Sequence, residues 1–401
     1  MISEKITVAR AKAQLSALKL IVKLVPAPVP YMFLGQHARF QLLEHIARLG
    51  VNKVLIVTDA ALFELGVIDP LAQRLSELSI DTVVYSGVIP DPDFNVVHNG
   101  LAMLRENECD AVLAVGGGSS IDAAKVIALA ASNKKTPREL VGILKARKPS
   151  LPLFVIPTTA GTGSEVTLGA VISDETTHIK NLVIDPKLVP LAAALDPEIM
   201  AGMPKTVTAD TGIDALTHCL ESWISDFSNE ETEMYSGSGV KLVLQNLERA
   251  CDNGQDLSAR EAMALAANYG GLALNKTGLG YVHAIAHQLG TQYGVPHGRA
   301  NAIVLPHVFE VNRPFAAGRL ATLARLCGLE ANTDEDAADK LIQRVKDLLR
   351  ALPMHLEVDG MDEQHFSVMA DAAMKEAHGT YAVPGYLNKE EIIRILHAIK
   401  G

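Results

Sequence analysis

The stretch that decides the fold is DAVLAVGGGSSIDAAKVIALAA, residues 110–131. It begins with a short apolar run, Asp110–Val115, that is typical of a buried strand, and after three glycines it ends in a helical run, Ile121–Ala131. Three further strand-like runs lie around it: Val51–Thr58, Thr82–Ser86 and Leu153–Ile156. Strands that alternate with helices favour a parallel sheet covered by helices.

The pattern changes at about Pro204, after which long helical patterns dominate. Examples are Thr211–Ser225, Ala259–Leu274, Tyr281–Tyr293, Asp336–Leu352 and Lys389–Lys400. We therefore expect an α/β domain over residues 1–200 and an all-α domain over residues 201–401. A ligand site is expected in the cleft between them, a common place for ligands.

Composition limits the classes of function. The 401 residues suit two domains, and the net charge of -10 lacks the basic footprint of a nucleic-acid-binding protein. The four cysteines form no CxxC pair and are too few for a disulfide framework, which favours a cytoplasmic setting.

The N-terminus is apolar but interrupted. Residues 11–25 contain Lys12, Lys19 and Lys23, so no run approaches the roughly 20 apolar residues of a membrane span. No signal-peptide pattern is present either. We expect an amphipathic arm over residues 1–28 that packs on the protein or on a neighbouring subunit, with a membrane or targeting role as the alternative.

The segment GGGSSID, residues 116–122, is a candidate phosphate-binding loop. Glycines between a strand and a helix let backbone N–H groups approach a phosphate at the helix N-terminus. The alternative is a tight turn that needs a positive φ. The spacing is neither GxGxxG after the first strand nor a Walker loop, so it predicts neither a standard Rossmann site nor an ATPase.

Two further features suit a dinucleotide. The loop PTTAGTGSEVT, residues 157–167, follows a strand and offers hydroxyls and glycines, although such loops often only cap helices. Asp59 ends the strand VLIVT, where a carboxylate could accept hydrogen bonds from the ribose hydroxyls of NAD and repel the 2′-phosphate of NADP. A helix cap for Ala60–Leu65 is the alternative role of Asp59.

Four of the thirteen histidines form a pattern with one aspartate. Asp214 and His218 lie four residues apart, as do His283 and His287, so each pair shares a helix face. His297 follows in a loop or at a helix start. A carboxylate with imidazoles and no thiolate suits Fe(II) or Zn(II) better than a closed structural zinc site. One of the five is spare, and spacing does not identify which.

At these residues the sequence resembles the iron-containing (group III) alcohol dehydrogenases. The resemblance runs from about Tyr31 to Ile399 and rests on four motifs in order: GGGSSIDAAK, PTTAGTGSEVT, DALTHCLES and HAIAHQLG…PHGRANAIVLPHV. It implies a dehydroquinate-synthase-like fold, with an α/β NAD-binding domain followed by a helical metal-binding domain. It further implies hydride transfer between a primary alcohol or its aldehyde and NAD. Because most soluble oligomers are symmetric and dimers are commonest, we expect a homodimer or larger homo-oligomer.

The resemblance also assigns roles to residues. The implied metal ligands are Asp214, His218, His283 and His297, and His287 matches the non-ligand catalytic histidine beside nicotinamide and substrate. The implied cofactor-binding residues are Asp59, Gly117, Gly118, Ser119, Asp122, Thr158, Thr159, Thr162, Thr167 and Lys180. The expected metal is Fe(II), with zinc as the alternative.

The chain departs from the family pattern at three places. Gly169 and Leu274 stand where the family often has asparagine and a bulky aromatic, which suggests room for a longer or branched alcohol. Residues 378–387, HGTYAVPGYL, replace a segment that often reads like TxxNPR. The rival activities are those of a glycerol dehydrogenase or maleylacetate reductase. A dehydroquinate-synthase-like lyase fits less well, because the expected pocket segments contain only Lys276 as a cation.

Overall fold

The computed structural model describes residues 14–15, 28–177 and 179–401. These residues divide into two compact units, one ending at Met203 and the other running from Pro204 to Gly401. The N-terminal arm expected over residues 1–28 lies outside the described residues, apart from positions 14, 15 and 28.

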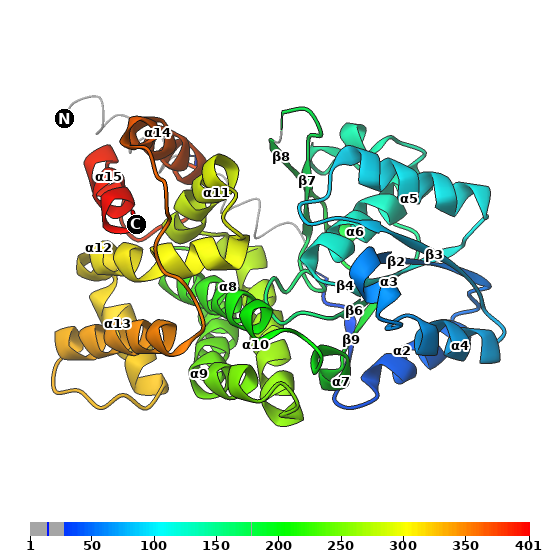
Figure 1. The fold of residues 1–401 in the computed structure, drawn as a ribbon, viewed down its shortest axis with the longest axis horizontal. Helices are drawn as coiled ribbons and strands as arrows, with labels where there is room; N and C mark the ends of the chain where they lie inside the picture. Colours follow the sequence, from blue (N-terminus) through cyan, green and yellow to red (C-terminus); the bar gives the residue numbers. More distant parts are fainter. Residues whose placement is uncertain (1–13, 16–27, 178) are drawn as a thin grey trace. The chain divides into compact units, whose positions relative to one another are not determined.

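The first unit is built on a six-stranded parallel sheet with the order β1-β9-β6-β4-β2-β3 (Figure 1). Its strands are β1 (Tyr31–Leu34), β2 (Lys53–Asp59), β3 (Asp81–Val88), β4 (Ala111–Gly116), β6 (Leu153–Pro157) and β9 (Ala192–Leu195). Its helices are α2 (Ala38–Arg48), α3 (Ala60–Glu64), α4 (Asp69–Glu77), α5 (Phe94–Glu106), α6 (Gly118–Asn133) and α7 (Pro197–Met200), with short 3₁₀ turns at Pro137–Leu140 and Pro186–Leu188. The predicted α/β architecture is therefore confirmed.

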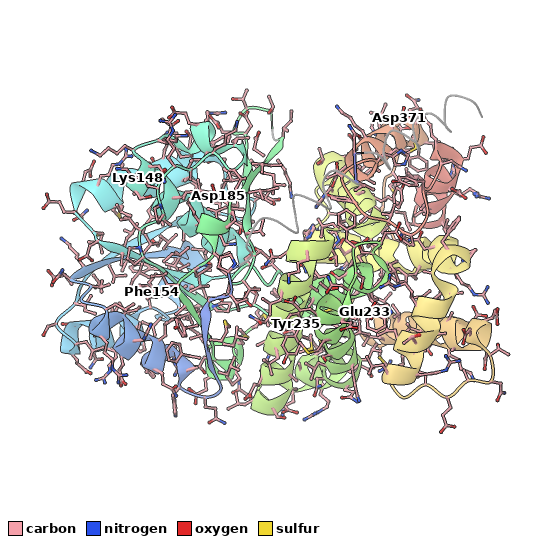
Figure 2. The ribbon with its side chains drawn as sticks, turned by 180° about the vertical axis from the view of Figure 1, so that it is seen from behind. Lys148, Phe154, Asp185, Glu233, Tyr235 and Asp371 are labelled. Carbon is pink, nitrogen blue, oxygen red and sulfur yellow. The ribbon has the colours of Figure 1, made fainter. Side chains whose placement is uncertain are left out.

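Alternate residues of the central strands face two separate cores. In β2, Leu55 and Val57 join the core formed with α5 and α6, while Val54 and Ile56 join the core formed with α2 and α4. Phe154 of β6 belongs to the second core and has no solvent exposure (Figure 2). Because both faces of a parallel sheet are buried, its strands are apolar along their whole length, as the sequence runs are.

A smaller sheet packs against α6. It has the order β5-β8-β7 and consists of β5 (Gly142–Ile143), β7 (Gly169–Ser173) and β8 (Lys180–Ile184). Strands β7 and β8 pair antiparallel and β5 pairs parallel with β8. The short apolar runs and turns of this region gave no clear strand signal in the sequence.

The second unit is built from helices (Figure 1). They are α8 (Lys205–Ile224), α9 (Glu230–Asp252), α10 (Leu257–Thr277), α11 (Tyr281–Tyr293), α12 (His297–Leu326), α13 (Asp334–Ala351), α14 (Phe366–Ala377) and α15 (Lys389–Ala398), with a 3₁₀ turn at Glu363–His365. This confirms the predicted helical domain. Within the described residues, none of these helices combines the length and apolar character needed to cross a membrane.

Candidate functional site

In the first unit, the candidate cofactor residues gather at one edge of the parallel sheet. Asp59, Gly116 and Pro157 are the last residues of β2, β4 and β6, which are neighbours in the sheet. The chain leaves β2 for β3 on one side and leaves β4 for β6 on the other, so the strand order reverses between β2 and β4. Ligands of open α/β sheets bind outside the carboxyl ends of the strands at such a reversal.

The two glycine-containing loops pack directly on each other. A Cβ atom at Gly118 would lie 2.7 Å from Cγ2 of Thr162, and one at Gly117 would lie 3.3 Å from Oγ1 of Thr159. The backbone N–H of Thr158 donates to the carbonyl of Gly116 at 3.0 Å. The packing requires glycine at these positions, because the second loop occupies the space that a side chain would fill.

Helix α6 begins at this point without a side-chain cap. Its N-cap is Gly117, Gly118 is its first residue, and Ser119 follows in the first turn. The first N–H groups of a helix have no partner inside the helix, and its dipole favours negative charge there. This helix start therefore has the features of a phosphate-binding site.

Asp59 does cap a helix. Its Oδ1 atom accepts a hydrogen bond from the backbone N–H of Leu62 at 2.9 Å, at the start of α3. Among the described residues its Oδ2 atom accepts no hydrogen bond. The helix-cap role is thus present in the structure, and one oxygen remains for a second partner.

Three of the expected cofactor residues, Thr167, Asp122 and Lys180, have side-chain partners far from them in the sequence. The side chain of Thr167 is buried and its hydroxyl accepts from Nζ of Lys125 at 2.9 Å, while Asp122 Oδ2 accepts from the backbone N–H of Val171 at 2.9 Å. Lys180, on β8, pairs with Asp91 at 2.9 Å. The first contact joins α6 to the loop before β7, and the second joins α6 to β7 itself, so both have a structural role whether or not a ligand is bound.

Sequence reasoning did not single out Lys125, which has no solvent exposure. Its ammonium donates to the carbonyls of Thr167 and Gly169 at 2.8 Å each, in addition to the Thr167 hydroxyl. Burial lowers the pKa of Lys125 to about 8, although Asp122 and Glu165 oppose the shift. Its position three residues after Asp122 in GGGSSIDAAK was the available signal, since a lysine on a buried helix face requires partners.

In the second unit, three helices bring the candidate metal ligands together. Helix α8 carries Asp214 and His218 on one buried face, α11 carries His283, and His297 is the first residue of α12. The ligand atoms of Asp214, His283 and His297 all lie within 4.8 Å of one another. Nε2 of His218 lies 3.8 Å from Oδ1 of Asp214, and its ring stacks on that of His283 with centroids 4.8 Å apart.

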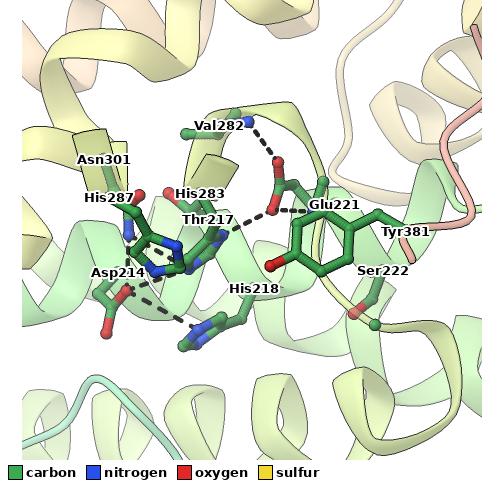
Figure 3. Close-up of polar contacts among 12 residues, drawn as sticks. Asp214, Thr217, His218, Glu221, Ser222, Val282, His283, His287, Asn301 and Tyr381 are labelled. Carbon is green, nitrogen blue, oxygen red and sulfur yellow. Dashed lines mark hydrogen bonds and ion pairs between the residues drawn. The ribbon is translucent and has the colours of Figure 1, made fainter. Parts of the chain in front are cut away.

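Asn301 marks the point where these atoms converge. Its Nδ2 atom donates to Oδ1 of Asp214 at 2.8 Å and lies 3.3 Å from Nε2 of His283 (Figure 3). The same atom lies 3.4 Å from Nε2 of His297. The amide nitrogen of Asn301 thus lies against one atom from each of the three side chains. The three side chains are therefore directed at a common place.

Glu221, which sequence reasoning missed, fixes the orientation of His283. Its Oε2 atom accepts from the backbone N–H of Gly280 at 2.8 Å and faces Nδ1 of His283 at 2.6 Å, and its Oε1 atom accepts from the N–H of Val282 at 2.7 Å (Figure 3). The carboxylate therefore caps α11 and holds the proton on Nδ1, which leaves Nε2 of His283 as a ligand atom. Its i+7 position from Asp214 on α8 was the signal in the sequence.

Burial and charge set the protonation of the cluster. Burial lowers the pKa of His218 to about 4, so its imidazole is neutral at neutral pH. Burial also opposes the charged form of His283, but Glu221 and Asp214 outweigh it and raise the pKa to about 9. A proton on His283 therefore gives the site a positive charge between Glu221 and Asp214. A bound cation can supply that charge in place of the proton.

The fifth member of the pattern, His287, faces a different partner. Its Nδ1 atom lies 2.7 Å from Oε1 of Glu376 on α14, while its ring stacks on that of His297 with centroids 5.4 Å apart. Burial lowers the pKa of His287, and the hydrogen bond to Glu376 opposes that shift. The structure thus separates His287 from the other four by its hydrogen-bond partner.

Comparison with known families agrees with this constellation. The family described as "Iron-containing alcohol dehydrogenase" matches residues 30–197, and "Fe-containing alcohol dehydrogenase family, C-terminal" matches residues 208–400. Alcohol dehydrogenase 4 of Schizosaccharomyces pombe is 43% identical over 332 residues, which are 82% of this chain and 78% of that protein. The chain belongs to the iron-containing alcohol dehydrogenase family.

Two other family members are similar over almost the whole chain. A protein of Bacillus methanolicus named NAD-dependent methanol dehydrogenase is 34% identical over 371 residues, or 92% of this chain and 97% of that one. The crystal structure of a 1,3-propanediol oxidoreductase superposes with a TM-score of 0.89 at 36% identity, covering 94% of this chain and 99% of that one. The similarity to this family therefore includes both units.

Proposed function

We propose that this protein interconverts a primary alcohol and its aldehyde, with NAD as the hydride acceptor or donor and a divalent metal, expected to be Fe(II), bound in the second unit. The single observation that carries the proposal is the convergence of Asp214, His283 and His297 on one point. Family membership and the names of the relatives support the same reaction.

The residues present fit a divalent metal. One carboxylate and three imidazoles are a hard-to-borderline ligand set that suits Fe(II) and can also accept zinc. Among the described residues, Nδ1 of the buried His218 has no hydrogen-bond partner, so no other group of this part of the protein holds that nitrogen. We assign Asp214, His218, His283 and His297 as the ligands.

The residues at the sheet edge fit NAD. The uncapped start of α6 at Gly117, Gly118 and Ser119 suits the pyrophosphate. The free oxygen of Asp59 suits the ribose hydroxyls. The hydroxyls of Thr158, Thr159 and Thr162 belong to the loop packed on the glycines. We propose that the unit ending at Met203 binds NAD and that the unit from Pro204 holds the metal.

When bound, the metal supplies a Lewis acid for the alcohol oxygen, and NAD supplies the hydride acceptor. Glu221 holds Nδ1 of His283, so Nε2 would be the ring atom available to hold the metal. His287 accepts the hydroxyl proton and passes it toward solvent, directly or through ribose hydroxyls and water. The side chain of His287 is 24% exposed, so a path to water exists.

The test is a substrate series from ethanol to octanol, with NADH formation followed by absorbance in protein loaded anaerobically with Fe(II). We expect turnover with NAD, and an optimum at longer or branched alcohols, because Gly169 and Leu274 are smaller than the asparagine and the aromatic residue that the family often has there. A Cβ atom at Gly169 would meet only Leu182 and Val183, at 3.8 Å and 3.9 Å. An absence of turnover with every alcohol and aldehyde would overturn the proposal.

We propose a cytoplasmic homodimer or larger homo-oligomer, since most oligomers are symmetric and dimers are commonest. All four cysteines are free thiols, which suits a reducing compartment. Sedimentation of the purified protein measures its state of assembly directly.

A further inference from the structure

The two ring nitrogens of His287 have different surroundings. Nδ1 lies 2.7 Å from Oε1 of Glu376, whereas Nε2 makes no hydrogen bond within the described part of the chain. Neither atom is needed to hold α11 together, because the helix is stabilised by its own backbone and by Glu221. The carboxylate of Glu376 therefore selects between the two tautomers of the ring.

Among the described residues, the other two hydrogen-bond partners of the Glu376 carboxylate are both donors. The hydroxyl of Tyr381 donates to Oε1 at 2.7 Å, and Nε2 of Gln288 lies 3.4 Å from Oε2. An acceptor surrounded by donors is held in its ionised form and in one orientation. The hydrogen bond with His287 therefore places the ring proton on Nδ1 and leaves the lone pair on Nε2.

Tyr381 comes from residues 378–387, the segment in which this chain departs from the family pattern. The hydroxyl of Tyr281, the first residue of α11, contacts both ends of that segment: Nε2 of His378 at 2.7 Å and the backbone N–H of Leu387 at 3.1 Å. Tyr281 is 1% exposed. The segment is thus fixed to the same helix that carries His287, and Tyr381 is placed over Glu376 by that attachment.

We propose that Glu376 and Tyr381 are positioning residues for His287, which hold its Nδ1 proton so that Nε2 exchanges the proton of the alcohol. The inference rests on the proposed function. In the direction of oxidation the O–H bond of the alcohol breaks and an N–H bond forms at Nε2, while the carbinol hydride passes to NAD. The imidazolium charge lies beside the Glu376 carboxylate until Nε2 returns its proton to water.

The first test reads the tautomer itself. Protein labelled with ¹⁵N-histidine and loaded with diamagnetic Zn(II) is measured by NMR, and the His287 signals are identified by their loss in His287→Ala. We expect the proton on Nδ1 in the wild type and in Glu376→Asp, and a mixture of tautomers in Glu376→Gln. A ring protonated at Nε2 in the wild type, or a Glu376→Gln spectrum like that of the wild type, would overturn the inference.

The second test separates positioning from binding. We expect Glu376→Gln to lower kcat by at least about tenfold while KM stays near its wild-type value, and Glu376→Asp to recover part of the loss. Tyr381→Phe, which removes one of the donors, has the smaller effect. Glu233→Gln is the matched control, because Glu233 pairs with Arg319 and contacts none of these groups.

The outcomes separate the inference from the function. If the wild type and Glu233→Gln oxidise alcohols and Glu376→Gln does so equally well, the positioning role is refuted and the proposed function stands. If the wild type turns over no alcohol, the proposed function fails, and the NMR spectra alone still decide whether Glu376 holds the Nδ1 proton.

Discussion

The two roles that the sequence presented as alternatives for Asp59 are compatible with each other. One carboxylate oxygen caps α3, and the other accepts no hydrogen bond among the described residues, at the sheet edge where we propose that NAD binds. Loss of the cap should change the free energy of unfolding little, since replacing an N-cap aspartate by glycine costs only a few tenths of a kcal/mol. Substitution by glycine therefore isolates the effect of the carboxylate on the cofactor.

We predict that Asp59→Gly raises kcat/KM for NADP relative to NAD by at least about tenfold, or about 1.4 kcal/mol, because a carboxylate repels the 2′-phosphate. Steady-state kinetics with both cofactors measure the ratio. The control is Asp93→Gly, since Asp93 caps α5 through the N–H of Val96 at 2.9 Å in the same manner. An unchanged ratio in Asp59→Gly would leave Asp59 with its structural role alone.

The different partners of the histidines predict different losses on mutation. We expect His287→Ala to lower turnover by about a hundredfold or more while the metal content stays at its wild-type level. Asp214→Asn, by contrast, should lose the metal, because Asp214 supplies the only carboxylate of the set. Elemental analysis of the two purified variants decides the assignment. Loss of metal from His287→Ala would make His287 a ligand.

At the scale of elements, Glu221 links the start of α11 to the metal site of α8. Both of its oxygens accept from N–H groups, so a glutamine would turn its NH₂ toward a donor in either orientation. We predict that Glu221→Gln weakens metal affinity by about 10- to 100-fold. It should also lower the free energy of unfolding by about 1–3 kcal/mol.

A competition titration with a metal chelator and a denaturant titration measure the two effects. Glu248→Gln is the control, because Glu248 forms an exposed pair with Arg344. If metal affinity is unchanged in Glu221→Gln, the carboxylate does not orient His283.

The contact between the two loops of the first unit predicts a cost for any side chain at Gly118. Gly118→Ala would place a Cβ atom 2.7 Å from Thr162, so the second loop must shift. We expect the free energy of unfolding to fall by about 1–3 kcal/mol, and we expect NAD to bind more weakly. Gly202→Ala is the control, since nothing lies within 4 Å of its Cβ position. Equal stability and equal NAD affinity in the two variants would contradict the close packing.

Helices and strands with a clear spacing of apolar residues could be predicted from the sequence, and those without such a spacing could not. The helix expected at Tyr281–Tyr293 is found at those residues. The apolar runs Val51–Thr58, Asp110–Val115 and Leu153–Ile156 correspond to β2, β4 and β6. Helix α12 runs from His297 to Leu326 through Pro306 and Pro314, where sequence rules place a boundary. The strands of the small sheet are only two to five residues long, which is too short for an alternation of apolar and polar residues to be recognised.

At the scale of the whole molecule, the division into an α/β unit and a helical unit followed from the change of period near Pro204. The ligand pattern was visible as two pairs spaced by four residues, because that spacing is a property of one helix. Glu221, Lys125 and Glu376 were not, since each acts on a residue far away in the sequence and only packing reveals the partner. The roles of the five patterned residues remain predictions that metal binding must test.

An anaerobic titration of the metal-free protein with Fe(II), with NADH formation from a primary alcohol followed by absorbance, tests most directly whether the protein is a metal-dependent dehydrogenase. We predict that turnover rises from the baseline and reaches its plateau at about one ion per chain, because one converging set of ligands is present among the described residues. Turnover that is equally fast without any metal, or a metal-loaded protein that forms no NADH from any alcohol, would show that the protein is not one.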